Sequence, residues 1–300
     1  AFYALGISKL LGEPVALVCS SGTATANFLP GAVEATHSNV PLLILTADRP
    51  PELQDWGALQ TIDQSSIYGR HVKWSVNIPV PEISKSMISY IRAMANRAVS
   101  TSMGSPRGPV HFNFPFRDPL EPAEIAEDIE LYASSSDNEI FSGRNSGRAF
   151  MTSTRPDYSL GKEKLRYIAS KFESMERGLI ICGPQMTAKL GHDIANLASK
   201  LKYPILADVL SNIRCGDHDR SFIIDHYDGF IRNSDLQREL SPEVVIRFGS
   251  LPVSKPLVEF LNRQAKAMHV LVTEDDRWRD PLHISSEIVH GDPVDFCKCL

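Results

Sequence analysis

The chain has 300 residues, 43% of them hydrophobic and 22% charged, with a formal net charge of −5 and a pI near 6.0. This composition is typical of a globular protein long enough for two domains, and the negative charge argues against nucleic-acid binding. No apolar run approaches the roughly 18 residues of a membrane-spanning helix, so we expect no membrane insertion. The five cysteines form neither a disulfide framework nor a zinc motif, which predicts a reducing, cytoplasmic location.

The first 120 residues alternate helix-like and strand-like segments, as in an α/β domain with a parallel sheet. Helical spacing of apolar residues predicts a helix over about Phe2–Leu11, and the apolar run Val15–Cys19 predicts a strand. The later segments of this half are a predicted helix over Ala24–Thr36, strands over Leu42–Ala47 and His71–Val76, a long helix over about Glu82–Ser100, and a strand over Val110–Phe114.

The composition changes between residues 121 and 158, where an acidic run precedes a stretch rich in serine, glycine and asparagine. Such a stretch is typical of a surface linker. The alternation then resumes, with predicted helices over Leu160–Glu173, Met186–Leu201 and Pro256–Arg263, and strands over Leu179–Cys182, Pro204–Ala207, Val244–Phe248 and Met268–Val272. The sequence therefore predicts two doubly wound parallel-sheet domains, residues 1–120 and 159–300.

A turn of small residues, Ser20–Thr23, joins the first predicted strand to a helix. Gly22 permits a tight turn, and small side chains let a ligand approach the backbone amides at the helix start. Ordinary helix capping by Ser21 or Thr23 explains the same residues, so the motif alone is weak.

Arg49 stands at the carboxyl end of the second predicted strand, in Asp48-Arg49-Pro50-Pro51. Its planar guanidinium suits a carboxylate ligand, although a surface pair with Asp48 is an equally good explanation. Because ligands of open parallel sheets sit beyond the carboxyl ends of the strands, this segment and the serine-rich turn are candidates for one site.

The loop Gly57–Gln64 carries two amides and a carboxylate, and here too the alternatives stay open. Thr61 could cap a short helix, which would leave Asp63 and Gln64 in solvent. His111, within a predicted strand, fits a structural histidine better than a catalytic base. No nucleotide-binding glycine motif and no complete catalytic set can be assembled from the spacing.

Longer stretches make the chain resemble a known family. The run SSGTATANFLPGAVEATHSNVPLLILTADRP and the later GPVHFNFP resemble the pyrimidine-binding domain of thiamine-diphosphate enzymes. TADRPPEL, GALQTIDQ and YGRHVKW narrow the resemblance to the MenD family, the carboligases of menaquinone biosynthesis. In the second half, VVIRFGSLPVSKPL and WRDP are similar to that family's central domain.

The resemblance implies a reaction and a set of site residues. The family decarboxylates 2-oxoglutarate on thiamine diphosphate and adds the succinyl carbanion to isochorismate, which gives 2-succinyl-5-enolpyruvyl-6-hydroxy-3-cyclohexene-1-carboxylate. By this resemblance Arg49 would hold the isochorismate acid group, and Gln60 would lie beside the reacting carbon. Ser21, Gly22 and Thr23 would line the pocket of the cofactor's aminopyrimidine half. Leu59 departs from the family pattern, which frequently has asparagine there.

The resemblance also implies parts that we expect outside this chain. The family's activating glutamate precedes the helix that begins at Ala1, and Mg²⁺ or Mn²⁺ is held by a third, diphosphate-binding domain after Leu300. We therefore expect a fragment with no catalytic residue or metal ligand of its own, inactive in isolation. The family forms homodimers or homotetramers.

Two other interpretations remain. An acetolactate-synthase-like enzyme shares the fold, and its central domain can bind FAD. Alternatively, the second half is a non-catalytic regulatory module in which Arg247 and Arg279 bind an acidic effector, although structural ion pairs are the simpler explanation of both arginines.

Overall fold

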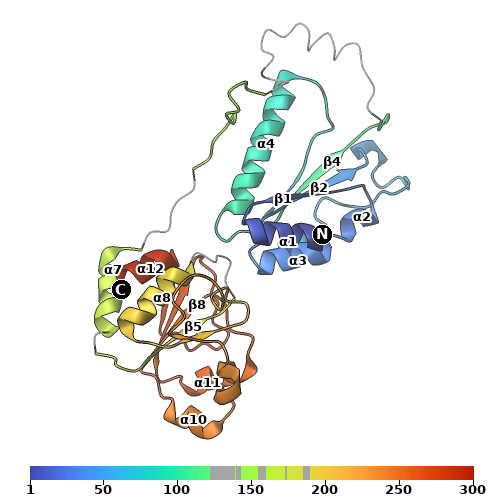
Figure 1. Ribbon diagram of the computed structural model, residues 1–300. Helices are drawn as coiled ribbons and strands as arrows, with labels where there is room; N and C mark the ends of the chain where they lie inside the picture. Colours follow the sequence, from blue (N-terminus) through green and yellow to red (C-terminus); the bar gives the residue numbers. More distant parts are fainter. Residues whose placement is uncertain (122–138, 140–142, 155–159, 173, 185–189) are drawn as a thin grey trace. The chain divides into compact units, whose positions relative to one another are not determined.

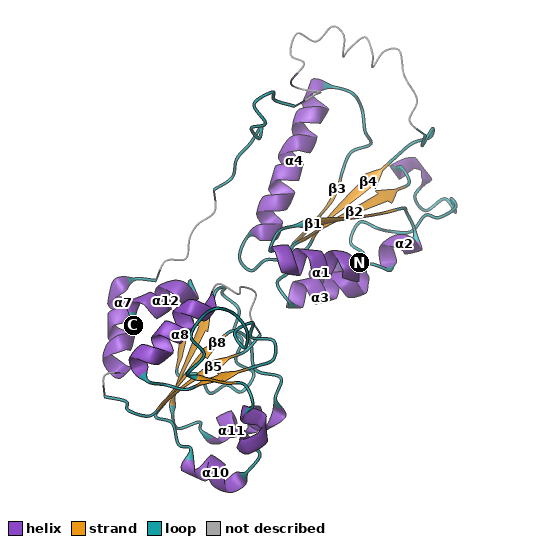
Figure 2. Cartoon of the chain, viewed as in Figure 1, coloured by secondary structure: helices purple, strands orange, loops and turns teal. Residues whose placement is uncertain are grey.

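The computed structural model describes residues 1–121, 139, 143–154, 160–172, 174–184 and 190–300. The chain divides into two compact units, Ala1–Arg155 and Pro156–Leu300. Within the described ranges each unit is built on one parallel sheet with helices against it (Figures 1 and 2), and these ranges contribute four strands to the first sheet and six to the second. This confirms the predicted class of two parallel-sheet α/β domains, while their predicted bounds stay a prediction.

The first sheet has the strand order β1-β2-β4-β3. Its strands are β1 (Val15–Cys19), β2 (Leu42–Asp48), β3 (Trp74–Asn77) and β4 (Val110–Pro115). In the register of the sheet, Cys19 lies opposite Thr46, and Thr46 lies opposite Asn113. The carboxyl ends of β1, β2 and β4 therefore meet at one edge, as parallel pairing requires.

Helices cover both faces of this sheet (Figure 1). The long helix α4 (Lys85–Met103) buries Met94 and Ala98 against Val110 and Phe112 of β4. Helix α1 (Phe2–Leu11) contacts β1 and α3 (Leu29–His37), and Gly12 ends α1 in the left-handed conformation that favours glycine.

The prediction of a single helix over Ala24–Thr36 is wrong, because the structure has two helices there. Helix α2 spans Thr23–Ala26, and α3 begins at Leu29 after a break at Asn27 and Phe28. Pro30 lies in the first turn of α3. A proline ring clashes with the carbonyl four residues earlier, so proline is tolerated at the start of a helix and not within it.

Two other boundaries of the first unit differ from prediction. Strand β3 begins at Trp74 and not at His71, because His71 closes the 3-10 turn η2 (Gly69–His71) with its amide on the Tyr68 carbonyl. Helix α4 begins at Lys85 and not near Glu82, because the Ser84 hydroxyl accepts the Met87 amide at 3.1 Å and caps the helix. A second 3-10 turn, η1 (Pro51–Leu53), follows β2.

The second sheet has the order β10-β9-β8-β5-β6-β7. Its strands are β5 (Gly178–Cys182), β6 (Ile205–Ala207), β7 (Ile223–Ile224), β8 (Val244–Phe248), β9 (Met268–Thr273) and β10 (Glu287–His290). Helices α7 (Lys162–Phe172), α8 (Leu190–Leu201) and α12 (Pro293–Cys299) pack together on one face. Helices α9 (Tyr227–Ile231), α10 (Ser234–Glu239) and α11 (Lys255–Arg263) lie on the other (Figure 2).

Of the described elements of this unit, β7, β10, α9, α10 and α12 have no counterpart in the prediction, whereas the three-residue β6 was predicted from its apolar run. Each of the missed elements has seven residues or fewer, too short for a periodicity that distinguishes helix from strand. The first residues of the helix predicted over Met186–Leu201 lie outside the described part of the chain.

Part of the stretch predicted as a linker packs along α4. Arg92 stacks over the Phe150 ring at 3.9 Å, and Asn96 donates to the Met151 carbonyl at 2.8 Å. The acidic run before it, apart from Glu121, lies outside the described residues. No helix in the described ranges is long and apolar enough to cross a membrane.

Candidate functional site

The residues predicted to bind ligands gather at the carboxyl edge of the first sheet. Ser21 and Gly22 follow β1, Asp48 ends β2, and Arg49 comes directly after it. The loop after β2 returns to this edge and contributes Gln60. The structure thus brings together five residues that the sequence placed in three separate segments.

Gln64 joins these segments through one buried carboxamide. Its Oε1 accepts the Gly22 amide at 2.6 Å, and its Nε2 donates to the Ala47 carbonyl at 2.9 Å and to Asn113 Oδ1 at 2.8 Å. Only 1% of Gln64 is exposed. The interpretation that left Gln64 in solvent is therefore wrong, because no helix forms around it and its amide satisfies backbone groups of two strand ends.

Asp48 supports the same edge from the end of β2. Its Oδ1 accepts the Arg49 amide at 2.7 Å and Gln54 Nε2 at 3.3 Å, while its Oδ2 accepts Asn113 Nδ2 at 2.7 Å. The carboxylate is 6% exposed. This carboxylate accepts the backbone amide of Arg49, and the described side chains of Asp48 and Arg49 form no ion pair. The explanation of Arg49 as half of a surface ion pair with Asp48 is therefore wrong.

The Arg49 guanidinium points toward the serine-rich turn. Its Nη1 donates to Ser21 Oγ at 3.3 Å, and the residue is only partly buried. A guanidinium carries five N–H donors, so this contact leaves the planar fork able to bind a carboxylate.

Gln60 closes over the same turn. Its Nε2 donates to Ser20 Oγ and to the Ser21 carbonyl, both at 2.9 Å, and its backbone has a φ of 56°, uncommon for a residue other than glycine. Gly22 has a φ of 75°, and a Cβ added there would lie 2.9 Å from the Gln60 Cγ. Glycine is therefore required at position 22 by its conformation and by the approach of Gln60.

His111 lies fully buried below this edge. One ring nitrogen, Nε2, is 2.8 Å from Thr46 Oγ1, and the other, Nδ1, is 3.0 Å from Ser75 Oγ. Burial away from water lowers the pKa of His111 from 6.5 to about 4, so the imidazole is neutral at pH 7. This environment suits the structural histidine that the sequence favoured.

Comparisons with known proteins agree with this geometry. The family model "Thiamine pyrophosphate enzyme, N-terminal TPP binding domain" matches residues 1–67, and "Middle domain of thiamine pyrophosphate" matches residues 162–300. Together the two models cover about two thirds of the chain. The chain belongs to the thiamine pyrophosphate enzymes.

Curated relatives within this family are similar over the whole chain. The 2-succinyl-5-enolpyruvyl-6-hydroxy-3-cyclohexene-1-carboxylate synthase of Bacillus cytotoxicus is 41% identical over 301 residues, which cover 100% of this chain and 49% of that protein. The synthases of Geobacillus kaustophilus and Chloroflexus aurantiacus are 43% and 40% identical, again over 100% of this chain and over 50% and 48% of their own lengths. The chain thus spans about half the length of the curated relatives it matches.

The turn after β1 fits the aminopyrimidine half of a thiamine pyrophosphate cofactor in its donors and acceptors. Gly22 cannot offer its amide, because Gln64 already accepts that hydrogen. The contacts would instead come from the exposed Thr23 hydroxyl, which can donate and accept, and from the Oε1 of the exposed Gln60, which can accept. Of the described residues, no group of three His, Cys, Asp or Glu side chains is placed to hold a metal ion.

The two arginines considered for an effector site in this family's middle domain are engaged by carboxylates. Arg247 is 5% exposed and pairs with Asp280 at 2.9 Å. Arg279 binds Asp275 at 2.5 Å and Ser250 Oγ at 2.8 Å. These contacts favour the structural interpretation of both arginines.

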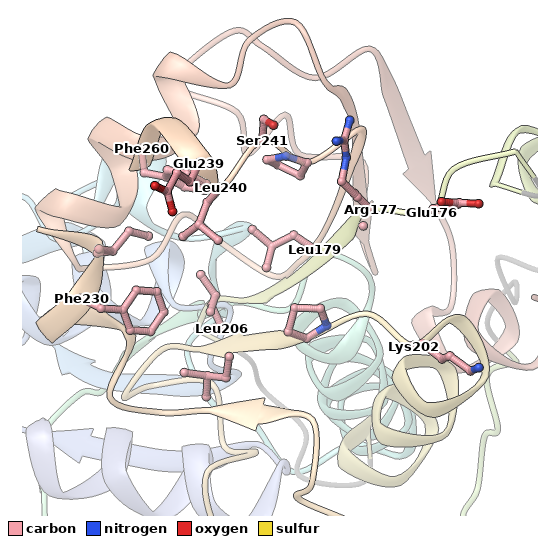
Figure 3. Close-up of a pocket in the computed structure, with 15 residues that line it drawn as sticks. Glu176, Arg177, Leu179, Lys202, Leu206, Phe230, Glu239, Leu240, Ser241 and Phe260 are labelled. Carbon is pink, nitrogen blue, oxygen red and sulfur yellow. The ribbon is translucent and has the colours of Figure 1, made fainter. Parts of the chain in front are cut away.

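A cavity of about 320 Å³ lies elsewhere in the second unit, where β5 and β6 begin. Figure 3 shows its mainly apolar wall, to which Leu179, Leu206, Phe230, Leu240 and Phe260 contribute. It is at the amino edge of the sheet, opposite to the edge where parallel sheets bind ligands. None of the residues predicted to bind substrate or cofactor lines it.

Proposed function

We propose that this chain provides the pyrimidine-binding and central domains of a menaquinone-pathway carboligase. The enzyme would decarboxylate 2-oxoglutarate and add the resulting succinyl unit to isochorismate. The observation that carries this proposal is the 40–43% identity to three curated synthases of that product, sustained over the whole chain. An acetolactate-synthase-like activity is the alternative that the test must exclude.

In this proposal Arg49 and Gln60 bind substrate. Isochorismate carries carboxylates, and the guanidinium fork of Arg49 matches a carboxylate with two parallel hydrogen bonds. Gln60 extends from the loop that closes over the turn, and its amide would orient the acceptor beside the reacting carbon. The contact from Nη1 to Ser21 Oγ supports this role, because it holds Arg49 next to the turn.

Ser21, Gly22 and Thr23 would line the aminopyrimidine pocket of thiamine diphosphate. The bound cofactor would supply the carbanion chemistry that decarboxylation requires. The residues of this chain would bind and orient substrate and exclude water. Mg²⁺ or Mn²⁺ would be held by a part of the enzyme that corresponds to the relatives' remaining length, and the active enzyme would be a cytoplasmic homodimer or homotetramer.

A chimera tests the reaction. The matched half of the Geobacillus kaustophilus synthase is replaced by this chain, so that the relative supplies the rest of the enzyme. With thiamine diphosphate and Mg²⁺, the absorbance of isochorismate is followed before and after 2-oxoglutarate is added. We expect a loss of absorbance that depends on 2-oxoglutarate.

Two reference reactions complete the test. The 300-residue chain alone should give no turnover, because it spans only half of the relatives' length. If the chimera consumes pyruvate and leaves isochorismate unchanged, the acetolactate-synthase-like alternative holds and the carboligase proposal is wrong.

A further inference from the structure

One peptide group, between Ser21 and Gly22, is held from both sides by the two glutamines of the loop that follows β2. Gln64 Oε1 accepts the N–H of this peptide at 2.6 Å, and Gln60 Nε2 donates to its carbonyl at 2.9 Å. The peptide is trans, so its N–H and its carbonyl point in opposite directions. The two side chains therefore bind opposite sides of the same peptide.

The orientation of the Gln64 carboxamide is set by groups that cannot reverse their own roles. The Ala47 carbonyl can only accept, so Gln64 must face it with Nε2, and the second hydrogen of Nε2 goes to Asn113 Oδ1. Oε1 is then the atom that faces Gly22. Gln64 is only 1% exposed, too buried for water to replace these contacts.

Gln64 thereby fixes a peptide that could otherwise turn over. Gly22 has a φ of 75° and a ψ of −141°, and because glycine tolerates either sign of φ, the peptide before it could rotate by half a turn with little movement of the side chains around it. The rotated peptide would bring the Ser21 carbonyl oxygen against Gln64 Oε1, which places two acceptors together. Gln64 cannot turn to avoid this, because the Ala47 carbonyl requires its Nε2.

The direction of this peptide decides how Gln60 is held. Gln60 is exposed, and its Nε2 donates to the Ser21 carbonyl and to Ser20 Oγ, both at 2.9 Å. With Nε2 bound to the turn, the Oε1 of Gln60 is left to accept from a ligand. A rotated peptide would present an N–H in place of the carbonyl, and Gln60 would then have to face the turn with its oxygen.

We propose that Gln64 is a positioning residue that acts on Gln60 through the Ser21–Gly22 peptide. The buried amide fixes the direction of the peptide, and the peptide fixes which atom of the exposed amide faces a ligand. The consequence for isochorismate rests on the function proposed above, whereas the direction of the peptide does not.

Hydrogen exchange of the Gly22 amide, followed by NMR in the 300-residue chain, tests the direction of the peptide. Gln64→Met removes the carboxamide acceptor and keeps a side chain of similar size. The Gly22 amide should then exchange about 100-fold faster relative to the Ile44 amide in β2, because it loses its buried acceptor. An unchanged ratio of the two exchange rates overturns the proposal.

Two further variants separate this effect from a general loss of stability. Met94→Ala shortens a buried side chain of α4 and destabilises the same unit away from the turn, so the ratio of Gly22 to Ile44 exchange should stay as in the wild type. Gln64→Glu keeps an acceptor for the Gly22 N–H and should keep this amide protected, which decides the matter if Gln64→Met does not fold. Loss of Gly22 protection in Gln64→Glu, or the same change of ratio in Met94→Ala, contradicts the role of Gln64.

The action on Gln60 has its own readout in the chimera. Gln64→Met should raise KM for isochorismate about tenfold and change kcat less, because the substrate-binding amide would be turned while the cofactor chemistry is intact. In a Gln60→Ala background, the same substitution should raise KM by no more than about twofold, since two residues that act through one contact are not additive.

An equal rise of KM in both backgrounds would show that Gln64 does not act through Gln60 and would overturn the positioning role. A wild-type chimera without activity would refute the proposed function, while the exchange of the Gly22 amide still decides the direction of the peptide.

Discussion

At the residue scale, Gln64 carries more of the site's geometry than the residues that the motifs pointed to. Its carboxamide forms hydrogen bonds with the turn after β1, with the end of β2 and with Asn113 in β4. Arg49, Gly22 and Gln60 could be singled out from the sequence because they stand at strand ends or within a recognisable motif. Gln64 and Asn113 stand in such motifs too, but their buried contacts could not be predicted, because these join segments that are more than 40 residues apart in the chain.

Removing the side-chain carboxamide of Gln64 should destabilise the first unit. Gln64→Leu leaves the Gly22 N–H, the Ala47 carbonyl and Asn113 Oδ1 without their partner in a buried place, which should cost about 3 kcal/mol of unfolding free energy. Urea unfolding followed by NMR signals of the first unit measures the loss. The control Gln60→Leu changes an exposed amide and should cost roughly 0.5 kcal/mol. Equal effects of the two substitutions would show that the Gln64 contacts do not stabilise the unit.

His111 should make the stability of the first unit depend on pH. The pKa of His111 is about 4 in the folded chain and 6.5 for an exposed histidine. At a pH between 4 and 6.5 the unfolded chain therefore binds more protons than the folded chain. Above pH 6.5 the neutral imidazole therefore costs the folded unit nothing. As the pH falls toward 4, the free energy of unfolding of the first unit decreases by up to about 3 kcal/mol. Denaturation midpoints of the wild type and of His111→Gln, measured between pH 4 and 7, should converge at low pH. The exposed His37 provides the control, since His37→Gln should keep the wild-type slope.

At the element scale, long helices and strands with a clear apolar run could be predicted, whereas short helices, the edge strands of the second sheet and interrupted helices could not. The bounds of β1, β5 and β8 were predicted to within one residue from their apolar runs. Strands β5 and β8 are buried on both faces, whereas alternate residues of β1 are exposed, with Val18 at 71%. The break between α2 and α3 was missed although Pro30 signals it, since the apolar spacing continues across the break. Strand β7 has two residues and forms only because β6 lies beside it, which no local pattern reveals.

The turn after β5 offers a test at this scale. A Cβ at Gly183 would lie 1.8 Å from the Ser250 carbonyl oxygen, which belongs to the backbone and cannot turn aside. Gly183→Ala should therefore destabilise the second unit by about 2 kcal/mol or more, as overpacked sites do.

Gly229 in α9 is the matched control, because a Cβ there would meet nothing within 4 Å. Gly229→Ala should be neutral or should stabilise the unit by about 0.5 kcal/mol, since alanine favours helix. Hydrogen exchange of amides in β5 and β8 reports both changes. Unaltered protection in Gly183→Ala would mean that the two loops do not approach as closely as described.

At the scale of the whole molecule, the chain combines the N-terminal and middle domains of its family and spans about half the length of its relatives. The candidate site lies in the first of these units, at an edge that is polar and open to solvent around Thr23 and Gln60. Sequence resemblance identified this edge, and the structure adds the buried network beneath it. The central claim is that this edge binds the acid group of isochorismate through Arg49.

The measurement that tests this claim most directly is kcat/KM for isochorismate in the chimera, with Arg49 and Arg70 each replaced by alanine. Arg70 is an exposed arginine on η2, in the same unit and outside the site. Arg49→Ala should lower kcat/KM about 100-fold, which corresponds to about 3 kcal/mol for a lost charged contact, whereas Arg70→Ala should stay within about twofold of the wild type. If Arg49→Ala retains the wild-type kcat/KM, the substrate acid is bound elsewhere and the account of this site is wrong.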